Sequence, residues 1–313
     1  MINILLTSAG GLTGIFLSKH LSSRKDINII AIDISAINPL KKWVKKFYTV
    51  PLIEDKNYLN SIKEIVTNEK IDIIIPITSY DVKFYSDKKI RANLGPTKLL
   101  LVDEDMDKIL SEKDRCYKYL NSIDIKTPKI YLNIKEVKYP LIMKPIRGSG
   151  SKNVNLIQGA EELEYWSKRN SNFILVEYIN GKEFTVDCLF DNDGVCYGAN
   201  VRERIKMNGG GAVVTKNNYD INIQPVLQKL EKSKKIKGPV NFQFKLTENN
   251  DLIIFDFNTR FASGGLALSV KSGFDIPNVL VDYLSGKEIA KWHPSPENNN
   301  LYLIKYFEEF YTN

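Results

Sequence analysis

Residues 240–265 read VNFQFKLTENNDLIIFDFNTRFASGG and decide the fold of the second half of the chain. Two runs in this stretch, 241–246 and 252–257, are apolar and aromatic, and the Asn-rich segment 247–251 lies between them. Such a pattern is typical of two antiparallel strands joined by a polar turn. We therefore predict a β-hairpin here.

The second strand of this hairpin carries polar residues in an unusual place. Strand side chains alternate between two faces, so Ile254, Asp256 and Asn258 are expected on one face. Phe255 and Phe257 are expected on the other. A carboxylate and an amide flanked by phenylalanines are costly to bury unless a cation satisfies them.

Carboxylate and amide oxygens suit Mg²⁺, which keeps some waters and is usually completed by substrate phosphates. Gln243 on the partner strand is expected to join Asp256 and Asn258 on the same face. Arg260, one alternating position further on, would bring positive charge to those phosphates. The alternative is a hairpin that ends in solvated polar residues, and a short motif needs its context to decide.

The composition limits the class of protein. A chain of 313 residues exceeds what one core usually serves, which predicts two or three domains. It contains no apolar run long enough for a membrane span, and its N-terminus lacks a signal pattern. Three cysteines without a C-x-x-C pair indicate a reducing, cytoplasmic setting without structural zinc. The net charge of +7 is spread along the chain, which argues against nucleic acid as the partner.

The chain opens with a β-loop-α-β pattern. A strand at 2–7 is followed by the glycine-rich loop 8–14, a helix to about residue 22, and a strand at 27–32 that ends in Asp33. This order is similar to a dinucleotide-binding fold, in which an acid binds ribose. Ala9 replaces the first glycine of that pattern, so we favour a tight turn that binds nothing or only a small anion.

The α/β pattern continues to about residue 105, and we place a domain boundary in the acidic stretch 103–105. Alternating short strands and helices predict a doubly wound parallel sheet with candidate substrate-binding loops at the carboxyl ends of its strands. The expected elements are strands at 47–50, 71–75 and 99–102 and a helix at 58–68, and the rim loops are 8–11, Asp33 and 78–81.

The next segment combines two lysines with a glycine-rich loop. We predict a helical segment over 106–121 that carries Lys113, and a strand over 139–145 that carries Lys144. The loop 146–154 contains Gly148, Ser149, Gly150 and Ser151 and lacks the order of a P-loop. Small residues let such a loop approach a triphosphate and donate backbone N–H groups. An ordinary glycine-rich hairpin turn is the alternative.

Residues 173–187 predict two strands that meet at a turn formed by Asn180 and Gly181. Backbone groups near this turn are available to an adenine, and Glu183 to a ribose diol. By itself the segment is an ordinary hairpin.

Four segments together resemble the ATP-grasp superfamily, specifically the branch similar to the carbamoyl-phosphate synthetase large subunit. They are residues 111–113, 139–154, 175–187 and 241–265, and the first domain resembles the pre-ATP-grasp domain. The resemblance implies a Rossmann-like parallel sheet over 1–105, so α/β, followed by an α+β ATP-grasp domain over 106–313. The latter would consist of a small lid subdomain at about 125–185 and a larger subdomain at 186–313.

The resemblance also implies a role for each matching residue. Nucleotide binding falls to the phosphate-holding lysines, the closing loop, the adenine-facing segment and the ribose-binding acid: Lys113, Lys144, Gly148, Ser149, Gly150, Ser151, Glu177, Tyr178, Ile179 and Glu183. Gln243, Asp256 and Asn258 would bind the metal, Mg²⁺ or Mn²⁺. The catalytic residues would be Arg260, Arg202 and Arg204, near the transferred phosphate or the substrate.

The implied activity is a stand-alone ligase that uses ATP to activate a carboxylate for attack by an amine, with a homodimer as the default assembly. Asp256 stands where the family usually has Glu, which puts a two-metal arrangement in doubt. Thr259 replaces the usual proline between Asn258 and Arg260. The alternatives are an NAD(P)-dependent oxidoreductase that uses loop 8–14, and a nucleotide sensor without turnover.

The rest of the chain predicts ordinary elements. We expect a helix within 222–235, a helix pair within 265–284 and a final strand within 301–311. His20 and His293 have no triad partners in the sequence pattern and are interpreted as structural or surface residues.

Overall fold

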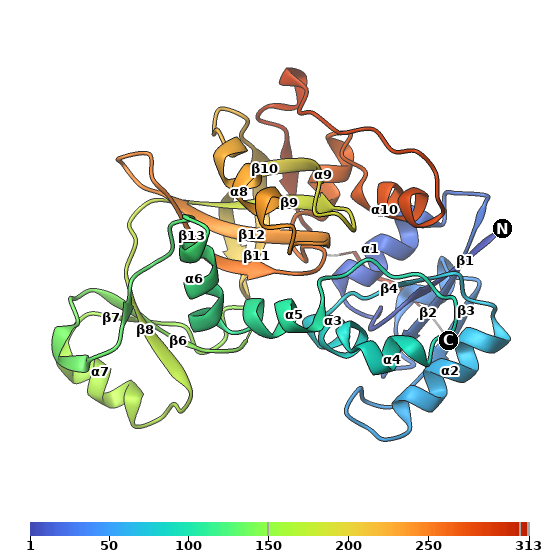
Figure 1. The fold of residues 1–313 in the computed structure, drawn as a ribbon, viewed down its shortest axis with the longest axis horizontal. Coiled ribbons are helices and arrows are strands. Elements are labelled where there is room, and N and C mark those ends of the chain that lie inside the picture. Colours follow the sequence, from blue (N-terminus) through green and yellow to red (C-terminus); the bar gives the residue numbers. More distant parts are fainter. Residues whose placement is uncertain (149, 307, 312–313) are drawn as a thin grey trace.

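A computed structural model describes residues 1–148, 150–306 and 308–311 of the protein. Its N-terminal part is a parallel sheet with the strand order β3-β2-β1-β4 (Figure 1). The elements are β1 (Ile2–Leu6), α1 (Leu12–Leu21), β2 (Ile27–Asp33), β3 (Lys46–Thr49), α2 (Tyr58–Asn68), β4 (Ile73–Ile75), α3 (Ser79–Ser86) and α4 (Lys88–Ala92). The predicted doubly wound pattern is confirmed.

Helices cover both faces of this sheet because its strands are apolar on both sides. Leu5, Ile32 and Ile74 belong to the core that also contains residues of α2 and α3. Leu6, Ile29 and Ile75 belong to a second core with residues of α1 and of α10 (Ile276–Leu284). His20 of α1 bonds Asp275 at the start of α10 at 2.8 Å, which agrees with a structural role.

The strand predicted near residues 99–102 is wrong. Only Lys98 pairs with the sheet, through a single parallel bridge to Ile73. Beyond it, Leu100 leaves the sheet and lies against Gly238, where an added Cβ would come within 2.4 Å of the Leu100 carbonyl oxygen. The apolar character of this segment therefore reflects burial between two parts of the molecule.

The helical segment predicted over 106–121 is present, and it is divided into two helices. They are α5 (Glu104–Leu110) and α6 (Lys113–Ser122), with Ser111 and Glu112 between them. Glu112 has an extended backbone (φ −107°, ψ 118°), and the Lys113 N–H bonds the carbonyl of Ile146 at 3.0 Å. This break places Lys113 on the first turn of α6.

A small antiparallel sheet with the order β5-β8-β6-β7 follows and packs against α7. Its elements are β5 (Ile130–Tyr131), β6 (Leu141–Pro145), β7 (Asn155–Ile157), α7 (Ala160–Ser167) and β8 (Phe173–Glu177). β9 (Lys182–Phe190) does not pair with β8, so the predicted hairpin over 173–187 is wrong. Gly181, with φ of 151°, turns the chain into another sheet where it lies against the backbone of Leu246.

That second sheet has six strands in the order β13-β12-β9-β10-β11-β14. Its remaining strands are β10 (Cys196–Asn208), β11 (Gly211–Asn217), β12 (Gly238–Leu246), β13 (Leu252–Asn258) and β14 (Tyr302–Ile304). Helices α8 (Gln224–Ser233), α9 (Leu266–Lys271) and α10 complete this part, as predicted. The final strand is shorter than expected, and residues 307, 312 and 313 of its flank lie outside the described residues.

The predicted hairpin over 241–257 is confirmed as β12 and β13, but its strict alternation is wrong. The register shifts between Gln243, which faces Asp256, and Phe244, which faces Ile254. Phe255 is therefore the extra residue of a β-bulge. As a result Phe255 lines two of the three hollows that Asp256 lines, and Ile254 lies in the core with Phe257.

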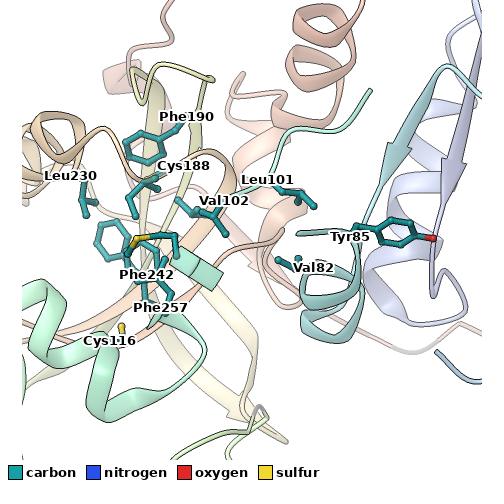
Figure 2. Packing of buried hydrophobic residues seen from close by; sticks show 14 of the residues in the cluster. Val82, Tyr85, Leu101, Val102, Cys116, Cys188, Phe190, Leu230, Phe242 and Phe257 are labelled. Atoms are coloured by element: carbon teal, nitrogen blue, oxygen red, sulfur yellow. The ribbon is translucent and has the colours of Figure 1, made fainter. Parts of the chain in front are cut away.

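One apolar core runs from the N-terminal helices into the six-stranded sheet, as Figure 2 shows. It joins Val82 and Tyr85 of α3 to Phe242 and Phe257 of the hairpin. Such a continuous core fixes the N-terminal loops relative to β13. The domain limits at residues 105 and 185 stay a prediction. No helix within the described ranges is long and apolar enough to cross a membrane.

Candidate active site

Three hollows meet at Asp256 on β13. The first, of about 270 Å³, is a cleft between the small sheet and the six-stranded sheet. The second, of about 70 Å³, lies beside it near three arginines, and the third, of about 370 Å³, lies toward α3 and α5. Asp256 lines all three. This carboxylate is therefore the junction of the candidate site.

The cleft gathers the residues predicted to bind a nucleotide. Those that line it are Lys113, Lys144, Gly148, Gly150, Ser151, Glu177, Tyr178, Ile179 and Glu183, together with Gln243 and Asp256 of the predicted metal set. Ser149, also predicted, lies outside the described residues. The structure thus brings together segments that are far apart in the sequence.

Lys144 is the most deeply buried cation of the cleft, with 5% of its surface exposed. Its Nζ donates to the Tyr117 hydroxyl at 2.5 Å and to the carbonyl of Phe255, the bulge residue, at 3.2 Å. Burial lowers the pKa of Lys144 to about 8, although the nearby Asp256 opposes the shift. A buried ammonium without a carboxylate partner is suited to an incoming anion.

A second cation and two glycine turns border the cleft near Lys144. Lys113 Nζ donates to the carbonyl of Gly148 at 3.2 Å. Gly148 and Gly150 have φ of 149° and 70°, in the region that favours glycine. A Cβ added to Gly210, in the turn between β10 and β11, would come within 2.5 Å of the Gly150 carbonyl carbon. The two turns therefore touch and close one end of the cleft.

Two carboxylates of the cleft are already engaged by other groups. Glu177 accepts the Lys129 N–H at 2.7 Å. Glu183 lies 2.7 Å from Arg204 Nε and 3.4 Å from Lys245 Nζ. A ribose at Glu183 would share it with these two cations. The sequence offered no sign of this pairing, because the partners come from other strands.

The predicted metal residues form a short oxygen-rich patch on the hairpin. Gln243 pairs with Asp256 across the strands, and Asn258 donates through Nδ2 to Asp256 Oδ2 at 2.9 Å. Asp256 is the one carboxylate of the predicted set, and the described part of the chain holds no cluster of three or more His, Cys, Asp or Glu suited to a metal. One carboxylate with two amide oxygens fits a single Mg²⁺ completed by phosphates and water.

The three predicted arginines line the second hollow. Arg260 donates to Ser79 Oγ at 3.1 Å and to the Phe261 carbonyl at 2.9 Å, and burial lowers its pKa. Arg202 is paired with Asp187 at 2.9 Å and is 1% exposed. Arg202 and Arg204 therefore have carboxylate partners, whereas Arg260 has none among the described residues. The unneutralised guanidinium at this hollow is that of Arg260.

The rim loops of the N-terminal sheet contribute unequally. In loop 8–14 the Gly10 N–H donates to Asp33 at 2.7 Å, and none of these residues lines the three hollows. Asp81 is buried, accepts from Ser8 and Thr78, and caps α3. Ser79 and Tyr80, in contrast, line the third hollow. Of the predicted rim segments, only the loop 78–81 therefore reaches the site.

Sequence reasoning missed several residues of the site. Tyr117 on α6 holds Lys144, and Asp107 on α5 and Lys83 on α3 line the third hollow. Their signal was weak, because Asp107 stands within an acidic run and Lys83 among many lysines.

Two family models match the chain. An N-terminal model, "PylC-like, N-terminal domain", matches residues 4–98. A model described as "ATP-grasp in the biosynthetic pathway with Ter operon" matches residues 169–310. Residues 169–310 therefore belong to the ATP-grasp superfamily. This match agrees with the position of the lysines, the glycine loop and the hairpin around one cleft.

The curated relatives of this ATP-grasp protein match it over different lengths. A D-alanine–D-alanine ligase of Fusobacterium nucleatum is 37% identical over 82 residues, which cover 26% of this chain and 29% of the relative. A carbamoyl phosphate synthase large chain of Clostridium beijerinckii is 25% identical over 50% of this chain and 16% of its own. A 3-methyl-D-ornithine–L-lysine ligase of Methanosarcina acetivorans is 21% identical over 81% of this chain and 66% of its own. The chain thus spans less than two thirds of each.

Solved structures show the same fold. The biotin carboxylase domain of a Hydrogenobacter thermophilus 2-oxoglutarate carboxylase, in complex with MgADP and bicarbonate, has a TM-score of 0.74 at 16% identity, over 96% of this chain and 73% of that one. An L-amino acid ligase of Bacillus licheniformis has a TM-score of 0.74 at 15% identity, over 94% and 78%. These likenesses confirm the predicted ATP-grasp architecture.

Proposed function

We propose that this ATP-grasp protein is an ATP- and Mg²⁺-dependent ligase that activates a carboxylate as an acyl phosphate for attack by an amine. The observation that supports it is the meeting of three hollows at Asp256, beside Lys113, Lys144 and Arg260. A reaction in which ATP activates an acid for attack by an amine needs three adjoining binding places, one for each reactant. The ligases among the relatives agree with this assignment.

The cleft is assigned to ATP. Glu177 and the backbone of Tyr178 and Ile179 face the adenine, and Glu183 binds the ribose. Lys113, Lys144 and the loop that contains Gly148, Ser149, Gly150 and Ser151 hold the phosphates. Mg²⁺, held by Gln243, Asp256 and Asn258, would neutralise phosphate charge and hold the terminal phosphate in position. Use of Mn²⁺ in its place stays a prediction.

The small hollow is assigned to the carboxylate. Arg260 lacks a carboxylate partner among the described residues, so an acid placed there gains an ion pair at low cost to existing contacts. Arg202 and Arg204 line the same hollow and are paired with Asp187 and Glu183. Transfer of the terminal phosphate of ATP to this acid releases ADP and forms an acyl phosphate. The group that leaves when the amine attacks is then phosphate and not oxide, which is a poor leaving group.

The amide then forms at the same carbon. The amine nitrogen attacks the acyl carbon, the bond between that carbon and the phosphate oxygen breaks, and phosphate leaves with the electron pair. The nitrogen releases a proton. No nucleophilic side chain is needed, and the chain contributes position and charge. The touching turns at Gly150 and Gly210 would keep water from the acyl phosphate.

A hydroxamate assay tests this proposal without knowledge of the amine. Purified protein, Mg-ATP and hydroxylamine are incubated with a panel of carboxylic and amino acids, and both ADP and hydroxamate are measured. We expect acid-dependent formation of both in equal amounts. Binding of Mg-ATP without acid-dependent ADP from any panel member would contradict the ligase and favour a nucleotide sensor.

The alternative function, an NAD(P)-dependent oxidoreductase, is disfavoured because the Asp33 carboxylate is already hydrogen-bonded to the backbone. Its two carboxylate oxygens accept the N–H groups of Gly10 and Ser35 at 2.7 and 3.0 Å. A ribose diol would have to displace these bonds. A homodimer stays a prediction.

A further inference from the structure

The third hollow has walls of mixed chemistry. Ile53, Phe84 and Leu110 provide apolar surface, and Phe255 and Asp256 separate the hollow from the nucleotide cleft. A molecule in it would therefore lie beside the proposed reaction centre. Its volume, about 370 Å³, is larger than that of the arginine-lined hollow.

Asp107 of α5 gives this hollow an unsatisfied negative charge. Its residue surface is 5% exposed, and the one hydrogen bond to its carboxylate among the described residues comes from Thr259 Oγ1 at 3.5 Å. No ion pair to it occurs in the described ranges. Burial raises the pKa of Asp107 to about 6, although Thr259, Arg147 and Lys83 oppose the shift. Such a carboxylate lacks the donors that a buried charge requires.

Lys83 of α3 gives the hollow an uncommitted positive charge. Lys83 is exposed, and its ammonium has no hydrogen bond or ion pair within the described part of the chain. Arg147, which lines the same hollow, is instead bonded to Glu112 at 2.6 Å. The hollow thus presents a buried acid that accepts one long hydrogen bond and an exposed base that forms no ion pair among the described residues.

We propose that this hollow binds the amine substrate, and that this substrate is a zwitterion such as an amino acid, with its ammonium at Asp107 and its acidic group at Lys83. The proposal rests on the proposed function. A simple amine would form no ion pair with the exposed Lys83, and a hydroxy acid would leave the buried Asp107 unsatisfied. Specificity of this kind arises because each analogue lacks one of the two charged contacts.

Calorimetric titration in the presence of Mg-ADP tests the binding of matched probes. The probes are the individual L- and D-amino acids, the amines that lack the carboxylate, and the hydroxy acids that lack the ammonium. We expect at least one amino acid to bind roughly 10- to 100-fold more tightly than its two analogues, the effect of one charged hydrogen bond. This readout requires no turnover.

Two variants that each remove one charge then assign the charges. Asp107→Asn is expected to weaken the amino acid about tenfold or more while leaving the hydroxy acid unchanged. Lys83→Gln is expected to weaken the amino acid and leave the simple amine unchanged. The controls are Asp105→Asn, on the same helix with its side chain 97% exposed, and Lys89→Gln on α4. Both controls lie outside the hollow and should bind like the wild type.

Failure of this proposal is separable from failure of the proposed function. Absence of binding by any amino acid in a protein that binds Mg-ADP and forms hydroxamates would overturn the zwitterion while leaving the ligase intact. Equal affinities in wild type and Asp107→Asn would overturn it as well. A protein that forms no acyl hydroxamate but selects amino acids through Asp107 would keep the site and lose the ligase.

Discussion

The chain contains two glycine-rich loops after buried strands, residues 8–14 after β1 and residues 148–151 after β6, and they use glycine for different purposes. In the first, a Cβ on Gly14 would come within 2.1 Å of the Ala9 carbonyl oxygen, and the Gly10 N–H is bonded to Asp33. In the second, a Cβ on Gly148 would come no closer than 3.9 Å, to Pro145.

This difference indicates that the glycines of loop 8–14 serve packing, whereas those of loop 148–151 serve ligand binding. Loop 8–14 needs glycine so that α1 can approach β1, and its backbone donor at Gly10 is used by the fold. The loop at 148–151 needs glycine for positive φ, and Gly148 and Gly150 line the cleft. Similar sequence patterns therefore led to similar expectations, and the surroundings distinguish them. The predictions below test this contrast.

Gly14→Ala is expected to have the largest effect, because the added methyl overlaps backbone that cannot move aside cheaply. We expect a loss of about 3 kcal/mol or more in the free energy of unfolding. The measurement is urea denaturation. Gly11→Ala, with no atom within 4 Å of the added methyl, is the matched control and should change stability little. Similar stabilities for the two variants would contradict a packing role for Gly14.

Lys144→Met should separate binding from stability. Loss of a buried cation that contacts phosphate is expected to weaken Mg-ADP roughly 100-fold. The pKa of Lys144 in the folded state, about 8, lies below its ordinary value of 10.5. The buried charge therefore lowers the free energy of unfolding below pH 8, and this loss becomes smaller as the pH rises from 8 toward 10.5. We therefore expect the variant to be more stable at pH 7 by up to about 3 kcal/mol.

Calorimetry and denaturation check these two effects separately. Lys135→Met, an exposed lysine outside the cleft, is the control and should change neither. A Lys144→Met protein that binds Mg-ADP like the wild type would remove this lysine from the phosphate site.

Asp107→Asn should change how stability depends on pH. The folded-state pKa of about 6 lies above the ordinary 3.8, so wild-type stability is favoured at low pH and falls as pH rises from about 4 to about 6. The variant lacks this fall and should exceed the wild type above pH 6 by up to about 3 kcal/mol. Chemical denaturation between pH 4 and pH 8 measures it. Equal curves for both proteins would show that Asp107 carries no uncompensated charge.

Gly150→Ala should have the smallest effect on the fold. The added methyl has room, since its nearest neighbour is the Gly209 carbonyl oxygen at 3.5 Å, but φ of 70° costs alanine about 1 kcal/mol. We expect this modest loss of stability together with an increase of about tenfold in the KM for ATP, because the loop would lose its preferred closed form. A large loss of stability with unchanged KM would make this loop resemble 8–14.

The sequence predicted those features that depend on neighbouring residues. Helix α2, Tyr58–Asn68, has the predicted bounds, and the hairpin that places Gln243 opposite Asp256 was expected from alternation and turn residues. Strand Leu141–Pro145 carries Lys144 as predicted. Local pattern is enough for such elements because their apolar periodicity and turn chemistry agree.

The features that it missed depend on long-range contacts. The bulge at Phe255 follows from pairing with β12, and the assignment of β8 and β9 to different sheets follows from the approach of Gly181 to Leu246. The pairing of Glu183 with Arg204 joins two strands, and the hydrogen bond from Thr259 to Asp107 joins residues that lie 152 positions apart in the sequence. None of these leaves a signal at a fixed spacing in one segment.

The most direct test of the nucleotide cleft compares the thermal midpoint of the protein with Mg-ADP, with ADP and EDTA, and with NADH. A ligand that binds only the folded state raises this midpoint according to its concentration and affinity. The ATP-grasp cleft at Asp256 predicts a clear rise with Mg-ADP, a smaller rise in EDTA and none with NADH. A rise with NADH alone would move the binding site to loop 8–14 and contradict the ligase.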